Sequence, residues 1–240
     1  MKTIIITGAS SGIGRAVAQA FLDAGWTTGL IARSADKLAQ ITHANAVALP
    51  CDVTDEAAVQ AAFDRFVGQT GRLDVLFNNA GMSGQMQTID QISLADWKAL
   101  IDLNLTGMFL AARAAFTQMK NQTPQGGRII NNGSISATTP RDGSIGYTTT
   151  KHGVTGMTKT LSLDGRAYDI AAGQIDIGNA ETAMVADMNA QRVARGEAAD
   201  PTMSVDEVAQ AVLHMAGLPV TTNVLSMTIM ANKMPFVGRG

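Results

Sequence analysis

Residues 3–14 read TIIITGASSGIG, a short apolar run followed by a glycine-rich turn. The run predicts a buried strand, and residues 13–24 predict a helix that ends at Gly25. A glycine-rich turn from a strand into a helix presents free backbone N–H groups and the positive helix end to an anionic ligand. The spacing G-x-x-x-G-x-G differs from the G-x-G-x-x-G dinucleotide fingerprint, so a tight turn without a ligand is the alternative.

The rest of the chain alternates between strand-like and helix-like segments. This alternation predicts one α/β domain over residues 1–240, with a parallel, doubly wound sheet and helices on both of its faces. The further strands are expected at residues 26–32, 46–49, 74–77, 128–132, 171–177 and 225–231, and the helices at 35–41, from 54 to beyond 66, 93–119, around 147 to 168, and 204–217.

Composition argues against several kinds of function. The 240 residues are 46% hydrophobic and 16% charged with a net charge of −2, which favours neither nucleic acid nor an anionic membrane surface as a partner. One cysteine, Cys51, and three histidines without metal-ligand spacing predict no internal disulfide and no metal site. The first residues lack a signal-peptide core and no apolar run reaches about 18 residues, so we expect a cytoplasmic protein without a membrane span.

Tyr147 and Lys151 lie four residues apart in GSIGYTTTKHGVTGMT, residues 143–158. Residues four apart share one face of an α-helix, so the ammonium of Lys151 can stand beside the phenol of Tyr147 and stabilise its anion. A phenol beside a cation is a stronger acid than an isolated one, which suits general acid–base chemistry near neutral pH. An amphipathic helix with a surface lysine is the alternative, and this spacing alone does not separate the two.

Polar residues follow the ends of several predicted strands. Arg33 follows the second strand, where a dinucleotide fold places an acid for NAD or an arginine for the 2′-phosphate of NADP. No acid stands there, which favours NADP(H), although an arginine after a strand is often only a solvated charge. Asn78 and Asn79 either close a turn or hold it open beside a nucleotide. Asn104 interrupts an apolar helix face, either kinking the helix or serving a site.

The segment 178–203 has an irregular pattern, with Met184, Val185 and Met188 on one possible helix face. A mobile lid over a pocket is typical of a segment that follows the carboxyl end of a strand. A surface helix without a functional role is the alternative.

Together these motifs resemble those of the classical short-chain dehydrogenase/reductase family, over nearly the whole chain. They occur in the family's order as TGASSGIG at 7–14, Asp52 with Val53, NNAG at 78–81, Asn104 in NLTG, Ser134, and Tyr147 with Lys151. The resemblance implies a seven-stranded Rossmann-type sheet and hydride transfer between a nicotinamide cofactor and a carbonyl or alcohol.

The resemblance also implies roles for single residues. Tyr147 corresponds to the acid–base residue and Ser134 to the hydrogen-bond donor to the substrate oxygen. Lys151 corresponds to the residue that holds the nicotinamide ribose, and Asn104 to one that positions a water relaying protons to Lys151. The expected cofactor contacts are Gly8, Ser11, Gly12, Ile13 and Gly14 at the pyrophosphate, Arg33 at the 2′-phosphate, Asp52 and Val53 at the adenine, Asn78 and Ala80 at the adenosine-side strand end, and Tyr147, Lys151, Ala180 and Thr182 at the nicotinamide.

Two positions depart from the family pattern. After the sixth strand the family usually has Pro-Gly, whereas this chain has Ile177 and Gly178. The loss of proline is expected to free the hinge of the lid. Ser11 stands where many NADP-preferring members have a basic residue, so Arg33 is the main support for NADP(H) over NAD(H).

The leading hypothesis is an NADP(H)-dependent carbonyl reductase or alcohol dehydrogenase with a small-molecule substrate. A 3-oxoacyl reductase and a sugar or polyol dehydrogenase share these catalytic residues and stay open, as does an NADP(H)-sensing regulatory protein without turnover. The resemblance further implies a homotetramer or homodimer. Its helices would approach closely through small residues at Ala111, Ala112, Ala114 and Ala115.

Overall fold

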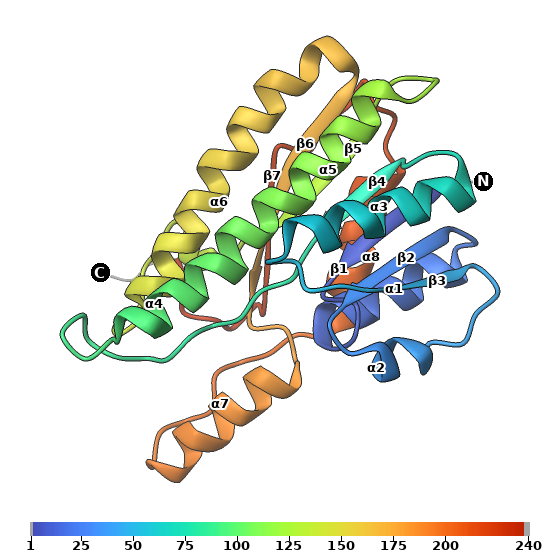
Figure 1. The fold of residues 1–240 in the computed structure, drawn as a ribbon. Coiled ribbons are helices and arrows are strands. Elements are labelled where there is room, and N and C mark those ends of the chain that lie inside the picture. Colours follow the sequence, from blue (N-terminus) through green and yellow to red (C-terminus); the bar gives the residue numbers. More distant parts are fainter. Residues whose placement is uncertain (1, 238–240) are drawn as a thin grey trace.

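The computed structural model describes residues 2–237, and all strands in that range belong to one parallel sheet. The sheet has seven strands in the order β3-β2-β1-β4-β5-β6-β7 (Figure 1), which confirms the predicted single-domain, doubly wound α/β fold. The strands are β1 (Thr3–Thr7), β2 (Thr27–Ala32), β3 (Ala46–Pro50), β4 (Val75–Asn78), β5 (Gly127–Asn132), β6 (Ile170–Gly178) and β7 (Ser226–Met230). The α-helices are α1 (Gly12–Asp23), α2 (Ala35–Ala39), α3 (Glu56–Thr70), α4 (Leu94–Ile101), α5 (Met108–Asn121), α6 (Ile145–Asp164), α7 (Ala183–Ala194) and α8 (Val205–Gly217).

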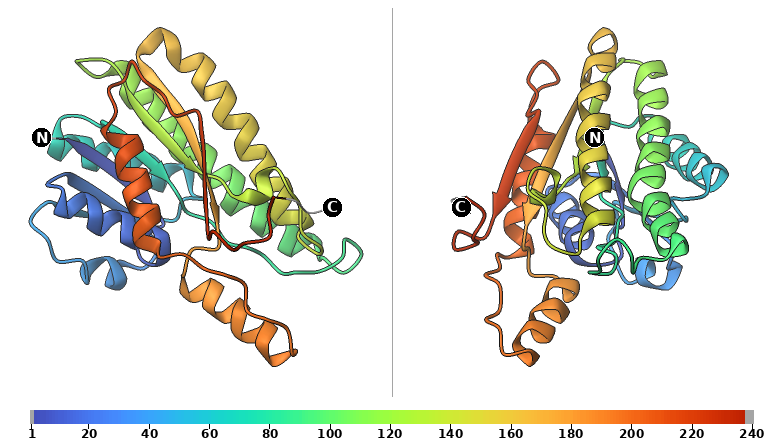
Figure 2. Two further views of the ribbon diagram at one scale, coloured as in Figure 1. Left: turned by 180° about the vertical axis from the view of Figure 1, so that it is seen from behind. Right: turned by 90° about the vertical axis from the view of Figure 1, so that its left-hand side faces the viewer.

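Strand β1 shows how the sheet is buried on both faces. Ile4 and Ile6 pack with α1 and α8 on one face, whereas Ile5 packs with α3 and α5 on the other. This follows from the period of two along a strand. Figures 1 and 2 show α3, α5 and α6 on one side of the sheet and α1 and α8 on the other. Because both faces are covered, polar side chains that meet a ligand belong at the edge where the strands end.

The strand order reverses between β1 and β4, which are neighbours in the sheet. The chain leaves β1 for α1 on one face and leaves β4 for α4 and α5 on the other. Connections that diverge in this way leave a crevice at the carboxyl edge of the sheet, where ligands bind in doubly wound folds.

The predicted helix over residues 93–119 is divided in the structure. A π-helical turn, Asp102–Gly107, separates α4 from α5. Asn104 lies in this turn, and its side chain bonds to the backbone of Met82 outside the helix. Its Oδ1 accepts the Met82 N–H and its Nδ2 donates to the Met82 carbonyl, both at 2.8 Å. Asn104 therefore marks a local change of helical pitch, as π-turns at functional sites commonly do.

The structure also defines the start of α3 and the helix within the irregular segment. Helix α3 is capped by Asp55, whose carboxylate accepts the Ala58 N–H at 3.0 Å, because Thr54 bonds to the Asp52 carboxylate instead. The irregular segment 178–202 contains α7, which Thr182 caps by accepting the Val185 N–H.

The expectation that Ala111, Ala112, Ala114 and Ala115 let two subunits approach is wrong. All four are at most 6% exposed within the chain itself, where α5 packs on the sheet beside α3. The exposed face of α5 carries larger side chains, including Phe109.

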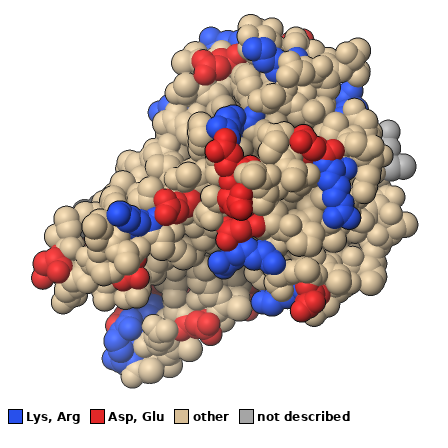
Figure 3. Space-filling model, viewed as in Figure 1, with Lys and Arg blue, Asp and Glu red and all other residues tan. Residues whose placement is uncertain are grey.

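Within the described residues, the helical run Leu94–Asn121 is long and apolar enough, by length and composition, to cross a membrane. Half of its most apolar window is buried inside the fold, which is the behaviour of a core helix packed on a sheet. On the face shown in Figure 3, basic and acidic side chains are interspersed rather than gathered into a field of one sign.

Phe66 and Phe109 offer a matched test of this packing. Phe66 is fully buried between α3 and β2, whereas Phe109 is 48% exposed. We expect Phe66→Ala to lower the free energy of unfolding by about 3–5 kcal/mol, because it leaves a cavity in the core. Phe109→Ala should cost less than about 1 kcal/mol. Denaturant titrations measure both, and equal losses would contradict the assigned core.

Candidate active site

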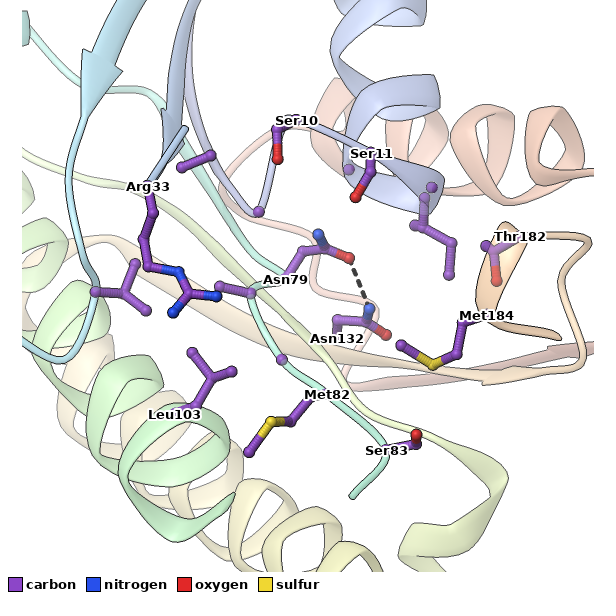
Figure 4. Close-up of a pocket in the computed structure, with 18 of the residues that line it drawn as sticks. Ser10, Ser11, Arg33, Asn79, Met82, Ser83, Leu103, Asn132, Thr182 and Met184 are labelled. Carbon is purple, nitrogen blue, oxygen red and sulfur yellow. Dashed lines mark hydrogen bonds between the residues drawn. The ribbon is translucent and has the colours of Figure 1, made fainter. Parts of the chain in front are cut away.

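A cavity of about 380 Å³ lies at the carboxyl edge of the sheet (Figure 4). It runs from the glycine turn after β1 to Tyr147 and Lys151 on α6, so it spans the topological switch between β1 and β4. Most residues singled out from the sequence line it: Gly8, Ser11, Gly12, Ile13, Gly14, Arg33, Asp52, Val53, Ala80, Tyr147, Lys151 and Thr182. Asn78, Asn104, Ser134 and Ala180 are not part of its lining.

The glycine turn is shaped by backbone conformations that favour glycine. Gly8 has φ 71° and Gly12 has φ 51°, both in the left-handed region. A Cβ on Gly14 would collide with the Gly8 carbonyl oxygen, so the turn closes tightly onto the start of α1. Ser11, the N-cap of α1, makes no side-chain capping bond, and neither does Ser144 at α6, whereas the N-caps of α2, α3, α4, α7 and α8 do. The first N–H groups of α1 are thus left for a ligand in the cavity.

Strands β4 and β5 each end in an Asn-Asn pair, and the two pairs are in register. The first members, Asn78 and Asn131, are buried and joined by a hydrogen bond of 3.2 Å. The second members, Asn79 and Asn132, line the cavity and are joined at 2.8 Å (Figure 4). The Asn78 side chain bonds to the Met108 carbonyl inside the fold and does not line the cavity, so the expected cofactor contact of Asn78 stays a prediction.

Tyr147 and Lys151 both open into the cavity from the first turns of α6. The Lys151 Nζ lies 5.5 Å from the centre of the Tyr147 ring, so the two side chains share one face of the helix. Lys151 is only 5% exposed, and its Nζ donates to the Asn132 carbonyl at 2.7 Å. This bond fixes the ammonium beside the phenol.

Ser134 is 5% exposed and lies just after β5, in the turn that packs against α6. Its hydroxyl oxygen accepts the Ser136 N–H at 3.1 Å. In the part of the chain that the structure describes, none of its hydrogen bonds uses the hydroxyl proton, which is left for another acceptor.

Arg33 and Asp52 line the other end of the cavity. Arg33 follows β2 and extends into the cavity towards the end of β4 (Figure 4). The N–H and hydroxyl of Thr54 hold the pKa of Asp52 below its usual value, and the charge of Arg33 contributes in the same direction. This end of the cavity therefore carries one arginine and one ionised carboxylate that is fixed in a turn.

The segment 178–203 is tied together at its base. Ala180 forms a β-bridge with Met203, where the Glu181 N–H donates to the Met203 carbonyl at 2.8 Å and the Met203 N–H donates to the Asn179 carbonyl at 3.0 Å. Ile177 lies opposite Ile229 where β6 pairs with β7, one residue before β6 ends at Gly178. The expectation of a freed hinge at Ile177 stays a prediction.

Comparisons with known proteins agree with this geometry. A family model described as short chain dehydrogenase matches residues 2–193. The chain belongs to the short chain dehydrogenase family. Members of this family are oxidoreductases that use nicotinamide cofactors.

Two curated members are similar over most of their length. Sulfoacetaldehyde reductase 2 of Chromohalobacter salexigens is 32% identical, over 96% of this chain and 94% of that protein. Glucose 1-dehydrogenase 2 of Bacillus subtilis is 35% identical, over 75% of this chain and 72% of that protein.

Two solved structures share the fold of this dehydrogenase. A 3-ketoacyl-(acyl-carrier-protein) reductase from Brucella melitensis complexed with NADH has a TM-score of 0.87 at 23% identity, covering 96% of this chain and 97% of its own. ElxO with NADP bound has a TM-score of 0.86 at 26% identity, with the same coverage.

The cavity of this dehydrogenase fits a dinucleotide on its own geometry. The start of α1, which no side chain caps, and the glycine turn provide backbone N–H donors. The turn is too tight to accept a side chain at Gly14. Sequence reasoning missed Asn132 and left the role of Asn79 open, and both residues form the cavity floor. The signal for them was the Asn-Asn ending shared by two strands, since neighbouring residues in a strand point to opposite faces.

Cys51 provides a test of the cavity's surroundings in this dehydrogenase. Burial raises the pKa of the Cys51 thiol to about 11, and the carboxylates of Asp52 and Asp55 add to the shift. We expect the native protein at pH 8 to react with a thiol reagent roughly 100-fold more slowly than free cysteine, because the thiolate is the reacting species. Absorbance with a disulfide reagent measures the rate, and the denatured chain is the control. A native rate equal to that of the denatured chain would contradict the assigned burial.

Proposed function

We propose that this dehydrogenase transfers a hydride between NADP(H) and a carbonyl or secondary alcohol, with Tyr147 as the acid–base residue. The observation that carries the proposal is the position of the Lys151 Nζ, 5.5 Å from the Tyr147 ring in a cavity that begins at an uncapped glycine turn. A protein that only sensed the nucleotide would have no need for a phenol held beside a buried ammonium.

The chain's own residues supply protons and position. A bound nicotinamide supplies or accepts the hydride. In the reducing direction the substrate oxygen gains negative charge, which the Tyr147 phenol and the Ser134 hydroxyl stabilise as two fixed donors. Lys151 stabilises the phenolate that remains after Tyr147 gives up its proton. Asn104 holds the Met82 backbone beside this site, and we assign it the placing of a water that returns protons through Lys151.

We assign the remaining contacts along the length of the cavity. The turn from Gly8 to Gly14, with Ser11, Gly12 and Ile13 between them, holds the pyrophosphate against the start of α1. Asp52 and Val53 border the adenine, and Ala80 the ribose beside it. Ala180 and Thr182, at the base of the segment 178–203, hold the nicotinamide amide, and this segment with α7 serves as the lid.

Arg33 supports NADP(H) over NAD(H), because no acid follows β2 and the guanidinium extends into the cavity. We expect Arg33→Ala to weaken NADPH binding by roughly 10-fold or more, the loss expected for a charge-assisted contact to phosphate, with NADH binding little changed. Fluorescence titration with both cofactors measures the two affinities. Arg65→Ala, an exposed arginine on α3 outside the cavity, is the matched control. An unchanged ratio of the two affinities in Arg33→Ala would remove the 2′-phosphate assignment.

Tyr147 can be compared with Tyr168, the second of the two tyrosines in the chain. Tyr147→Phe should lower kcat for carbonyl reduction by at least about 10²-fold, because the general acid is lost. NADPH affinity should stay within a few-fold, since the ring and Lys151 remain. Tyr168→Phe removes a hydroxyl from a ring packed on Phe116, outside the cavity, and should leave kcat unchanged. Tyr147→Phe with wild-type turnover would contradict the proposed acid.

The names of the relatives support a small carbonyl or hydroxyl compound as the substrate. They include a sulfoacetaldehyde reductase and a glucose dehydrogenase, so aldehydes, ketones and sugars are all candidates. A panel of short aldehydes, ketones, sugars and 3-oxoacyl thioesters, followed at the NADPH absorbance, separates these classes. The absence of turnover with every compound would favour the nucleotide-sensing alternative.

A further inference from the structure

Asp176 is a buried carboxylate beside the site, and the mechanism above does not use it. It lies near the end of β6 and is 5% exposed. Its Oδ1 accepts the Ser134 backbone N–H at 2.9 Å. A Cβ on Gly133 would collide with this oxygen, so the chain approaches Asp176 closely just before Ser134. The carboxylate therefore meets the backbone of the residue whose hydroxyl the proposed function assigns to the substrate oxygen.

Asp176 is itself held from helix α6. Gln174 Nε2 donates to Asp176 Oδ1 at 2.7 Å and to the Thr155 hydroxyl at 3.0 Å. The Gln174 Oε1 accepts the Thr158 hydroxyl at 3.3 Å. The carboxylate thus connects the Ser134 turn with the helix that carries Tyr147 and Lys151, and Gln174 sets its orientation.

Burial raises the pKa of Asp176, and three neighbours oppose that shift: the Gln174 amide, the Ser134 N–H and the charge of Lys151. A carboxylate at this depth is retained only where hydrogen bonds or charges compensate it. Both of the hydrogen bonds given above fall on Oδ1, the oxygen that meets Ser134. These two bonds therefore link the Gln174 amide, through Asp176 Oδ1, to the backbone N–H of Ser134.

We propose that Asp176 is a positioning residue that holds the Ser134 hydroxyl at the distance from Tyr147 that carbonyl reduction requires. This inference rests on the function proposed above. A shift of about 1 Å in a donor can cost roughly 100-fold in rate, so an anchor on the backbone of Ser134 affects turnover without touching the substrate.

A double-mutant cycle tests whether Asp176 acts through Ser134. Asp176→Ala should lower kcat/KM for the best carbonyl of the panel by roughly 10-fold in the wild-type background, and by less than about 2-fold in Ser134→Ala, because the group it positions is already gone. Asp176→Asn keeps the acceptor oxygen and should retain kcat/KM within about 3-fold. NADPH affinity should change less than about 2-fold in every variant.

Asp74→Ala is the matched control. The Asp74 carboxylate also accepts a backbone N–H, that of Thr3 at 2.8 Å, but at the opposite end of the sheet. It should lower thermal stability without changing kcat/KM. If Asp176→Ala does not fold, as judged by circular dichroism, Gln174→Leu replaces it in the cycle, because it removes the donor that orients Asp176.

Three results would overturn the role of Asp176. An equal loss in both backgrounds would show that it acts independently of Ser134, and a loss in Asp176→Asn as large as in Asp176→Ala would show that the acceptor is not its contribution. A loss of kcat/KM in Asp74→Ala equal to that in Asp176→Ala would show that Asp176→Ala acts only by destabilising the fold. Failure of the wild-type chain to turn over any carbonyl is a different result, which contradicts the proposed function and the role of Asp176 with it.

Discussion

Hydrogen bonds that side chains make at the ends of β1, β4 and β5 hold the cavity together. Asn79 Nδ2 donates to the Thr7 carbonyl at 2.9 Å, Asn132 Nδ2 donates to Asn79 Oδ1 at 2.8 Å, and Lys151 Nζ donates to the Asn132 carbonyl at 2.7 Å. These bonds run without a break from the residue before Gly8 to the lysine beside Tyr147. Since neighbouring strands lie about 4.8 Å apart, the sheet itself sets the distance between the glycine turn and the pair of Tyr147 and Lys151.

A second set of polar side chains lies deeper in the fold, on β4, β5, α6 and β6. Asn78, Asn131, Thr158 and Gln174 are each at most 3% exposed and bond in that order, which leads to Asp176 and the Ser134 turn. Buried polar groups destabilise a fold unless they are paired, and a fully paired set gives the core one arrangement. The hydrogen bonds among these buried polar side chains therefore make the sheet edge below the cavity rigid.

The sequence predicts the parts of this structure that repeat. Strand and helix alternate along the whole chain, so the sheet follows from periodicity, and the glycine turn is a local signal of its own. Pairing between distant residues is not a local signal. Whether Asn78 or Asn79 faces the cavity depends on the register of β4, and the burial of Ala111 depends on which side of α5 meets the sheet. The backbone bond from Ser134 to Asp176 joins residues 42 positions apart, and no periodicity predicts it.

The segment proposed as the lid is packed much less tightly than the floor of the cavity. Helix α7 has no buried residue and extends away from the body of the molecule (Figures 1 and 2). The segment is held at its base, where Ala180 and Met203 form a bridge that keeps Thr182 at the mouth of the glycine turn. Few packing contacts mean a low free energy for local opening, so α7 can move while its base stays in place. Met184 on α7 lines the cavity, so under the proposed function a substitution there alters the substrate side of the cavity without disturbing the bonds that place Tyr147, Lys151 and Ser134.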